Sequence, residues 1–183
     1  MTIYNFIEKY KIPEKICDDF IEYHKTNKEY KNKGIVGDGY IDTSIKNSTD
    51  VTFYNNSNNQ NIKIFFEHLS LSVTEYIKKY KINGVLRTEI AHNIQHYKPN
   101  QGYDYLHYER SAGETYRQLV YTLYLNTVKD KGGTFFPFQQ TTISANKGNL
   151  IIFPADFTHL HKGIISTTEE KYIVTGWFTN KWI

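Results

Sequence analysis

Hydrophobic positions follow two different periods along this 183-residue chain, and the change falls near Gly84. Before that point apolar residues recur every three or four positions, which is the spacing of an amphipathic helix. One helical pattern precedes Pro13, a second (EKICDDFIEYHKTN) follows it, and a third extends from about Ile62 to Tyr80. The N-terminal part is therefore predicted to supply helices that bury one face.

Residues 31–61 interrupt these helical patterns. They are rich in Gly, Asn, Ser and Asp, as in KNKGIVGDGY and NNSNNQN. This composition predicts a loop region, with a short strand at VTFY. The loop could cover a substrate as a lid, or it could be an ordinary surface loop.

After Gly84 the apolar residues alternate with a period of two in short β-branched or aromatic segments. The segments are TEIAHNIQHY, YDYLHYE, QLVYTLYLN, GTFFPF, NLIIF, THLHKGI and KYIVTGWF. Turn residues separate them at 100–102, 131–133, 147–148 and 154–156. We expect one domain over 1–183, mainly β with N-terminal helices (α+β). Residues 1–84 would form a helical support and loop region, and residues 85–183 a core of seven or eight strands in a barrel or sandwich.

The two faces of these strands differ in polarity. In the strand at 118–126 one face is apolar: Leu119, Tyr121, Leu123 and Leu125. The other face is more polar: Gln118, Val120, Thr122, Tyr124 and Asn126. A similar mixed face in 171–178 carries Lys171, Ile173, Thr175 and Trp177. Because alternate side chains share a face, the apolar face predicts helix cover, and the mixed faces predict either a polar cavity or a solvated sheet surface.

Composition excludes several classes of protein. The net charge is +3, and only three of the 22 basic residues are arginines, so we expect no nucleic-acid partner. A single cysteine, Cys17, excludes a disulfide framework and multi-cysteine metal sites. We find neither an apolar run of membrane-spanning length nor the features of a signal peptide, so we expect no membrane association and a cytoplasmic location.

Two histidine elements carry the candidate chemistry. His107 and Glu109 are two residues apart, on one face of a predicted strand. With seven histidines and 19 acidic residues in the chain, nearly one such pair is expected by chance. A second element, His159-Leu160-His161, could add another imidazole. Two histidines and a carboxylate form the facial triad of non-haem Fe(II) enzymes, and they also form catalytic zinc sites.

Lys171 is the residue that favours a bound anion. It begins an apolar strand and would point inward on the same face as Thr175. A lysine inside a barrel is costly unless it meets an anion. Tyr124, inward on another strand, could donate a second hydrogen bond. This combination suits a dicarboxylate that chelates the metal at its other end, although an exposed Lys171 at a frayed strand end is the alternative.

At these residues the chain resembles the 2-oxoglutarate- and Fe(II)-dependent dioxygenases, particularly the prolyl 4-hydroxylase-like group. The matching segments are Ile94–Arg110, Leu119–Asn126, Gly132–Pro137, Lys147–Gly163 and Lys171–Phe178, with Ile45–Asp50 as a less specific match. The resemblance implies a double-stranded β-helix, which is a jelly-roll or cupin-like barrel, with helices packed on its outer face. It also implies Fe(II), 2-oxoglutarate and O2 as cofactor and cosubstrates.

The resemblance assigns roles residue by residue. It implies that His107, Glu109 and His161 are the metal ligands and catalytic residues, with His159 as the rival of His161. Lys171 and Tyr124 would bind the distal carboxylate of 2-oxoglutarate, and Thr175 would line the same pocket. Two further aromatic residues, Tyr97 and Trp177, would line the substrate site.

The carboxylate ligand departs from the family pattern, because the usual Asp is replaced by Glu109. A small residue there would indicate a halogenase, so Glu favours hydroxylation. The implied activity is C–H hydroxylation with release of succinate and CO2, acting on a prolyl peptide or protein. The alternatives are a free amino acid or small metabolite as substrate, or a non-catalytic cupin-like barrel that binds metal or sugar.

Overall fold

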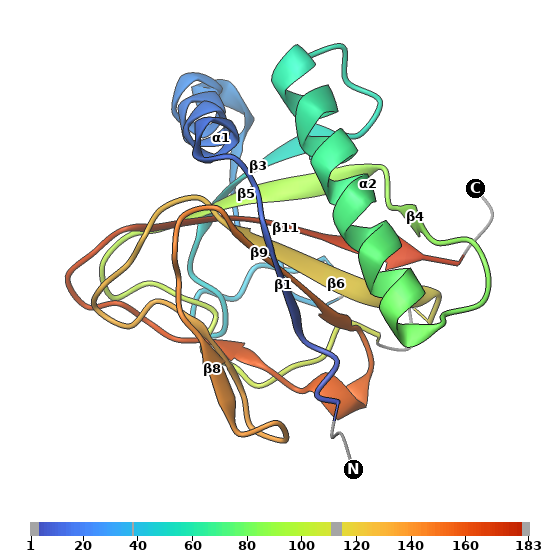
Figure 1. The fold of residues 1–183 in the computed structure, drawn as a ribbon. Coiled ribbons are helices and arrows are strands. Elements are labelled where there is room, and N and C mark those ends of the chain that lie inside the picture. Colours follow the sequence, from blue (N-terminus) through green and yellow to red (C-terminus); the bar gives the residue numbers. More distant parts are fainter. Residues whose placement is uncertain (1–3, 38, 111–114, 181–183) are drawn as a thin grey trace.

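A large antiparallel sheet dominates the fold (Figure 1). The computed structural model describes residues 4–37, 39–110 and 115–180. The sheet has the strand order β1-β9-β6-β11-β5-β3-β2, and β4 pairs with the end of β11. Its strands are β1 (Glu8–Lys11), β2 (Lys31–Lys33), β3 (Thr49–Tyr54), β4 (Arg87–Thr88), β5 (Ala91–Tyr97), β6 (Arg117–Tyr124), β9 (Asn149–Pro154) and β11 (Lys171–Thr179). β11 and β6 thus lie at its centre.

A smaller sheet lies on the opposite side of the large sheet from the two α-helices (Figure 1). It contains β7 (Thr134–Phe136), β8 (Thr141–Ile143) and β10 (Lys162–Gly163) in the order β10-β7-β8. The helices are α1 (Glu14–Thr26) and α2 (Gln60–Tyr80), with short 3-10 turns η1 (Lys28–Tyr30) and η2 (Phe157–His159). Among the described strands the two sheets remain separate and do not close into a continuous barrel.

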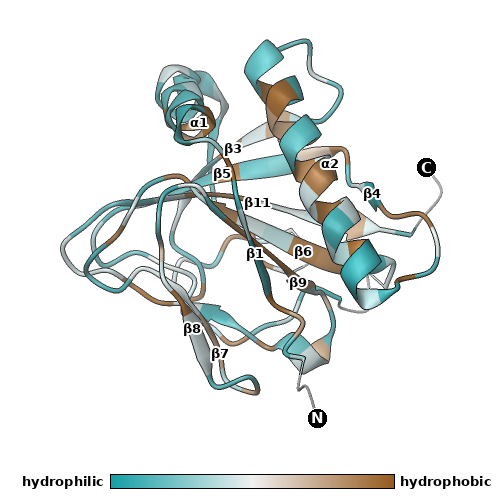
Figure 2. Cartoon of the chain, in the orientation of Figure 1, coloured by the Kyte–Doolittle hydropathy of each residue, from teal (hydrophilic) through white to brown (hydrophobic). Residues whose placement is uncertain are grey.

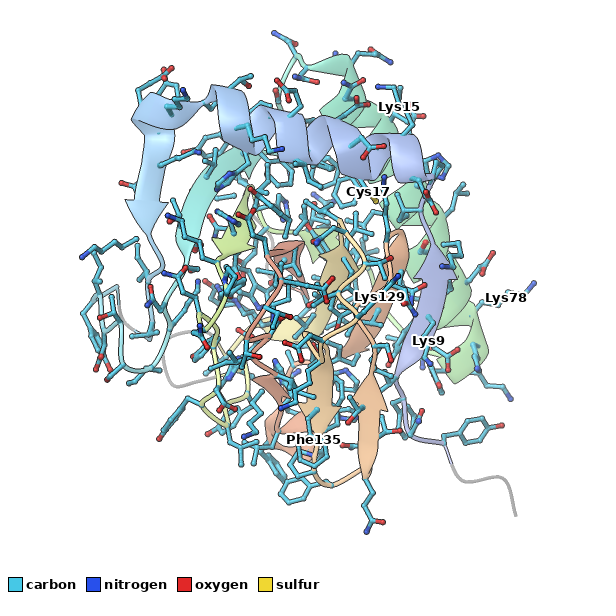
Figure 3. The ribbon with its side chains drawn as sticks, turned by 90° about the vertical axis from the view of Figure 1, so that its left-hand side faces the viewer. Lys9, Lys15, Cys17, Lys78, Lys129 and Phe135 are labelled. Carbon is cyan, nitrogen blue, oxygen red and sulfur yellow. The ribbon has the colours of Figure 1, made fainter. Side chains whose placement is uncertain are left out.

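Residues at the helix ends account for where α1 begins and for where α2 begins and ends. Pro13 precedes α1, where its fixed φ suits a helix start. Asn59 caps α2 by accepting hydrogen bonds from the N–H groups of Asn61 and Ile62, and Lys81 ends it in the left-handed conformation. Figure 3 shows Lys15 projecting outward from α1, while Cys17 lies on the side of the helix that faces the sheet. This amphipathic arrangement confirms both of the later helical patterns.

The main core lies between the helices and one face of the large sheet. Leu119, Tyr121, Leu123 and Leu125 are at most 4% exposed and pack with Phe20, Phe65 and Leu69 of the helices. Figure 2 shows apolar bands on α2 separated by hydrophilic ones, as expected for a helix with one buried face. The apolar face of the strand at 118–126 is therefore covered by helices, as predicted.

A second apolar cluster joins the other face of the large sheet to the small sheet. It includes Val120 and Tyr124 from β6, Phe153 from β9 and Phe136 from β7. Phe136 and Phe153 pack edge to face with ring centroids 4.9 Å apart. This cluster packs the small sheet against the large one.

Three local predictions were wrong. The helical pattern before Pro13 is instead strand β1, which pairs with β9 through Tyr10 and Leu150. The segment YDYLHYE is not a strand, because it contributes only the isolated bridges Lys46–Tyr103 and His107–His161. THLHKGI divides into the turn η2 and the two-residue strand β10. In each case pairing with a distant segment decides the structure.

Residues 31–61 are more ordered than a loop region. They contain β2, β3 and the start of α2, and β3 pairs along its length with β5. The segment 1–84 therefore contributes three strands to the large sheet in addition to its helices. Between β2 and β3, described loop residues such as Ile35 and Tyr40 line the cavity between the sheets.

Candidate active site

A cavity of about 970 Å³ lies between the two sheets. Its floor is the inner face of the large sheet, including Thr122 and Tyr124 of β6 and Lys171, Thr175 and Trp177 of β11. The mixed faces predicted from sequence therefore line a cavity and are not an ordinary solvated surface. The volume is near the upper end of the roughly 300–1,000 Å³ typical of small-ligand sites.

His107, Glu109 and His161 meet at one side of this cavity. Each offers one ligand atom, and these atoms all lie within 4.8 Å of one another. His107 and His161 form a two-residue antiparallel bridge, in which each backbone N–H donates to the other residue's carbonyl at 2.9–3.0 Å. The N–H of Glu109 donates to the carbonyl of Ala155 at 3.0 Å. The backbone thus brings together residues that lie on two distant segments.

The tautomers of both imidazoles follow from their backbone partners. Nδ1 of His107 lies 2.7 Å from the carbonyl oxygen of Tyr105, and Nδ1 of His161 lies 2.9 Å from that of His159. A carbonyl oxygen only accepts hydrogen bonds, so Nδ1 carries the proton on both rings. Both Nε2 atoms therefore present lone pairs, and second-shell bonds of this kind are usual for histidines that bind metals.

Glu109 completes a set of electron-rich atoms. Its Oε1 lies 3.4 Å from Nε2 of His107 and 3.7 Å from Nε2 of His161. Burial raises the pKa of this carboxyl group, but the adjacent imidazoles outweigh burial and hold the pKa well below its usual value, so Glu109 is a carboxylate. Burial also lowers the pKa of His161, which favours the neutral imidazole. A cation fits between these three atoms, because they would otherwise face one another unneutralised.

Aromatic side chains support the cluster. Tyr103 stacks on His107 with ring centroids 3.9 Å apart and planes 11° apart. Phe136 and Phe153 contact His161, with ring centroids 5.6 and 4.9 Å away. Sequence reasoning assigned none of these three a role. Tyr103 lies in the quoted motif, but only the fold places it against the imidazole.

His159 lies away from the cluster. Its side chain is 3% exposed, its Nε2 lies 2.9 Å from the carbonyl oxygen of Asn5, and its Nδ1 lies 2.9 Å from Oγ1 of Thr158. Both ring nitrogens are thus engaged outside the cavity. This geometry argues against His159 as the rival of His161.

Lys171 lies on the cavity floor with a 5% exposed side chain. Its Nζ lies 3.4 Å from the carbonyl oxygen of Ile164 and 4.8 Å from the ring centroid of Tyr97. Burial lowers the pKa of this amine from 10.5 to about 8. No carboxylate of the described residues forms an ion pair with Lys171. The site therefore fits an anionic ligand.

The remaining candidates also lie on the cavity wall. The hydroxyls of Tyr124 and Thr134 are 2.7 Å apart, and Thr175 donates to the carbonyl oxygen of Tyr121 at 3.2 Å. Tyr97 is 3% exposed and donates to Oε1 of Gln95 at 2.7 Å. Thr134 was missed from sequence, because it lies on the small sheet and approaches Tyr124 only through the fold.

Trp177 has a contact that sequence reasoning did not anticipate. Its indole Nε1 donates a hydrogen bond to Oε2 of Glu109 at 3.0 Å. Arg117 lies over the indole ring and pairs with Glu89. No local pattern links these residues, because each lies on a different element.

The helices in the described ranges include none that is long and apolar enough to cross a membrane.

Comparison with known proteins relates the C-terminal part of the chain to a family. Residues 92–179 match the family model described as the 2OG-Fe(II) oxygenase superfamily. The search of curated proteins finds no match.

Solved structures of similar fold include several prolyl hydroxylases. A viral collagen prolyl hydroxylase from Paramecium Bursaria Chlorella virus-1, solved as a 2-oxoglutarate complex, is 21% identical with a TM-score of 0.71, and 97% of each chain is covered. A prolyl-4-hydroxylase from Pseudomonas putida is 15% identical with a TM-score of 0.74, covering 97% of this chain and 94% of that chain. A prolyl hydroxylase from Trichoplax adhaerens, in complex with a peptide fragment of hypoxia inducible factor, is 14% identical with a TM-score of 0.74, covering 96% and 84%.

These likenesses confirm the predicted fold class, a double-stranded β-helix of the jelly-roll type with helices on its outer face. The family match also confirms the predicted dioxygenase class and its requirement for Fe(II), 2-oxoglutarate and O2. Residues 92–179 thus match the 2OG-Fe(II) oxygenase superfamily, and the chain has the fold of solved prolyl hydroxylases.

Proposed function

We propose that this protein hydroxylates a prolyl residue within a peptide or protein. Bound Fe(II) and 2-oxoglutarate supply, with O2, the oxidative decarboxylation to succinate and CO2 that delivers one oxygen atom to a substrate C–H bond. The protein's own contribution is to bind, orient and enclose the reacting groups.

His107, Glu109 and His161 are the metal ligands in this proposal. The observation that carries it is the convergence of three ligand atoms without protons within 4.8 Å of one another. Two neutral imidazoles and one carboxylate on one side of the ion would leave its other positions open, as in the facial triad of non-haem iron enzymes. The Nδ1–H bonds to backbone carbonyls hold both rings in the ligand tautomer.

Lys171 and Tyr124 bind the distal carboxylate of 2-oxoglutarate in this proposal, and Thr175 lines the same pocket. Lys171 is a buried cation for which a ligand carboxylate would supply the missing counter-ion. The Tyr124 hydroxyl can donate to the same carboxylate while accepting from Thr134. Both side chains lie on adjacent, paired strands, β11 and β6.

A peptide substrate is supported by the outer part of the cavity. Tyr40, Tyr105 and Tyr108 line it and are 56%, 59% and 44% exposed. Proline-rich segments in extended conformation dock on grooves lined by aromatic residues. Tyr97 and Trp177, the substrate-lining candidates, line the same cavity and are less exposed than these three tyrosines.

The inner faces of β3 and β5 add polar groups suited to a peptide backbone. Thr52, Asn93 and Gln95 line the cavity there, and Thr52 donates to Oδ1 of Asn93 at 2.9 Å. Side-chain amides both donate and accept hydrogen bonds, as peptide groups do. These groups can therefore bind the backbone of an extended peptide.

The experiment is a substrate panel monitored by succinate release and mass spectrometry. Proline-rich peptides, matched peptides with alanine in place of each proline, and free proline would be incubated with Fe(II), 2-oxoglutarate and air. We expect substrate-stimulated succinate and a gain of one oxygen atom only with the proline peptides, and none with His161→Ala. Oxygen gain on free proline alone would replace the peptide proposal with the small-metabolite alternative.

A binding test separates enzyme from non-catalytic barrel. Anaerobic addition of Fe(II) and 2-oxoglutarate to the protein should give a visible charge-transfer band. Absence of both the band and succinate would favour the cupin-like binding barrel.

A further inference from the structure

The two carboxylate oxygens of Glu109 have different partners. Oε1 faces the imidazoles of His107 and His161 at 3.4 and 3.7 Å. Oε2 accepts the hydrogen bond from Nε1 of Trp177 at 3.0 Å. Because an indole N–H can only donate, and Oε2 is the oxygen that it engages, this bond fixes which oxygen faces the imidazoles.

Trp177 is itself held from two sides. The guanidinium carbon of Arg117 lies 3.8 Å from the centroid of the indole ring. Arg117 donates to both oxygens of Glu89, at 2.7 and 3.1 Å, and both side chains are mostly buried. The backbone N–H of Glu89 donates to the carbonyl oxygen of Trp177 at 3.0 Å. Glu89 therefore fixes the tryptophan through its backbone and, by way of Arg117, through the face of its ring.

The side chain of Glu109 is long enough to need the orientation that the hydrogen bond from Trp177 provides. A glutamate has one more rotatable bond than an aspartate, so its carboxylate has more orientations to lose when it binds a metal. It can also turn both oxygens toward an ion, which would occupy a further position. A hydrogen bond to one oxygen removes much of this freedom before the metal arrives.

We infer that Trp177 is a positioning residue that holds Glu109 as a one-oxygen metal ligand, and that the Glu89–Arg117 ion pair clamps the indole in place. The inference rests on the proposed role of Glu109 as a metal ligand. It gives Trp177 a function beyond lining the substrate site, and it gives the Glu89–Arg117 pair a function at the metal centre.

Metal affinity tests the inference without turnover. Mn(II) binding would be measured by electron paramagnetic resonance, with no 2-oxoglutarate present. Trp177→Phe keeps an aromatic ring under Arg117, removes the N–H donor and makes the ring system smaller. We expect its Mn(II) dissociation constant to rise about 10- to 100-fold, the effect typical of removing an outer-shell partner. An unchanged dissociation constant would overturn the inference.

A double-mutant cycle identifies the group through which Trp177 acts. Glu109→Asp shortens the carboxylate so that it no longer reaches the indole and the metal together. In that background Trp177→Phe should change Mn(II) affinity less than about twofold, because the interaction is already lost. An equal loss in both backgrounds would show that Trp177 affects the metal by another route and would overturn the positioning role.

The clamp and the fold need separate controls. Glu89→Gln keeps the shape of the side chain and removes the charge that orients Arg117, so it should weaken Mn(II) binding less than Trp177→Phe does. Thermal unfolding without metal should be nearly the same for wild type and Trp177→Phe; a large loss of stability would indicate a structural role. Wild-type protein that binds no Mn(II) or Fe(II) would contradict the proposed function, whereas wild-type binding with an unaltered Trp177→Phe contradicts only this inference.

The indole also supplies a direct signal. The chain has two tryptophans, and Trp182 lies outside the described residues. In a Trp182→Phe background Trp177 is the sole tryptophan. Its fluorescence should fall on addition of Mn(II), with the same dissociation constant as that measured by electron paramagnetic resonance. Fluorescence that does not change with Mn(II) would contradict contact between Trp177 and the metal ligand.

Discussion

Lys171 and Tyr97 are directly paired across β11 and β5, and the lysine ammonium lies 4.8 Å from the tyrosine ring centroid. Both side chains are buried. A cation over an aromatic face is stabilised, but this offsets only part of the cost of removing an ammonium group from water. The two residues therefore form a candidate anion-binding site. The Tyr97 ring orients the Lys171 amine, and a bound carboxylate would neutralise its charge.

Removing the Lys171 amine should weaken binding of 2-oxoglutarate. Truncating one partner of a buried charge pair costs roughly 2–5 kcal/mol, which is about 30- to several-thousand-fold in affinity. Lys171→Ala should therefore raise the dissociation constant of 2-oxoglutarate by that range, measured by calorimetry in the presence of Mn(II). Affinity for Mn(II) alone should be unchanged. An unaltered 2-oxoglutarate affinity would place Lys171 outside the cosubstrate site.

The pH dependence of the same binding reaction follows from the lowered pKa. In the free protein Lys171 has a pKa of about 8 in place of 10.5, because it is buried. Binding requires the charged amine, so above about pH 8 the affinity for 2-oxoglutarate should fall by about tenfold per pH unit. Lys171→Arg, which remains charged throughout, should remove this decline if it retains binding. The same decline in Lys171→Arg would assign the pH dependence to another group.

The same shift makes folding of the ligand-free protein pH-dependent. Between about pH 8 and 10.5 the unfolded chain keeps the Lys171 proton that the folded chain has lost. Since the unfolded state binds more protons there, the free energy of unfolding should rise with pH over this window. Urea unfolding of wild type and Lys171→Met at several pH values would isolate the contribution. A difference between the two proteins that does not change with pH would contradict it.

Tyr124 should contribute less than Lys171 to cosubstrate binding. Its hydroxyl already has one partner, Thr134, at 2.7 Å. A typical hydrogen bond contributes about 0.5–1.5 kcal/mol net, so Tyr124→Phe should weaken 2-oxoglutarate binding about 2- to 10-fold. Thr134→Val is the matched control, because it removes the neighbouring hydroxyl and leaves the tyrosine in place. A larger loss in Thr134→Val than in Tyr124→Phe would make Thr134 the principal donor.

The alternation of side chains between the two faces of a strand made part of the site predictable. Side chains at alternate positions share one face, so Lys171, Thr175 and Trp177 had to point the same way once the segment formed a strand. The apolar face of β6 likewise had to lie under the helices because nothing else could bury it. These inferences need only local pattern, and the structure agrees with them.

Long-range pairing made the rest unpredictable. Residues Glu8–Lys11 form a strand because β9 offers them a partner, although their own pattern suggested a helix. His107 approaches His161 through an isolated bridge, and the polar alternation around His107 does not produce a strand there. The indole of Trp177 reaches Glu109 across 68 positions of the chain. No local rule specifies such contacts.

His159 and His161 show that the alternation of side chains expected for a strand does not hold across a turn. Two residues apart on a strand, both imidazoles would share a face. Instead His159 ends the turn η2, whose start Asp156 caps by accepting from the N–H of Thr158. The chain direction changes between the two histidines, so one ring lies against Asn5 and the other faces Glu109.

The two histidines should therefore respond differently to truncation. His161→Ala removes a proposed ligand and should abolish measurable Mn(II) binding and turnover while leaving a cooperative thermal transition. His159→Ala removes a buried side chain with hydrogen bonds to Asn5 and Thr158, so it should cost about 1–3 kcal/mol in the free energy of unfolding. Its Mn(II) affinity should match wild type at temperatures where it is folded. Urea titration and Mn(II) binding measured by electron paramagnetic resonance on the same preparations give both quantities. If folded His159→Ala lost Mn(II) binding and His161→Ala retained it, the roles of the two histidines would be exchanged.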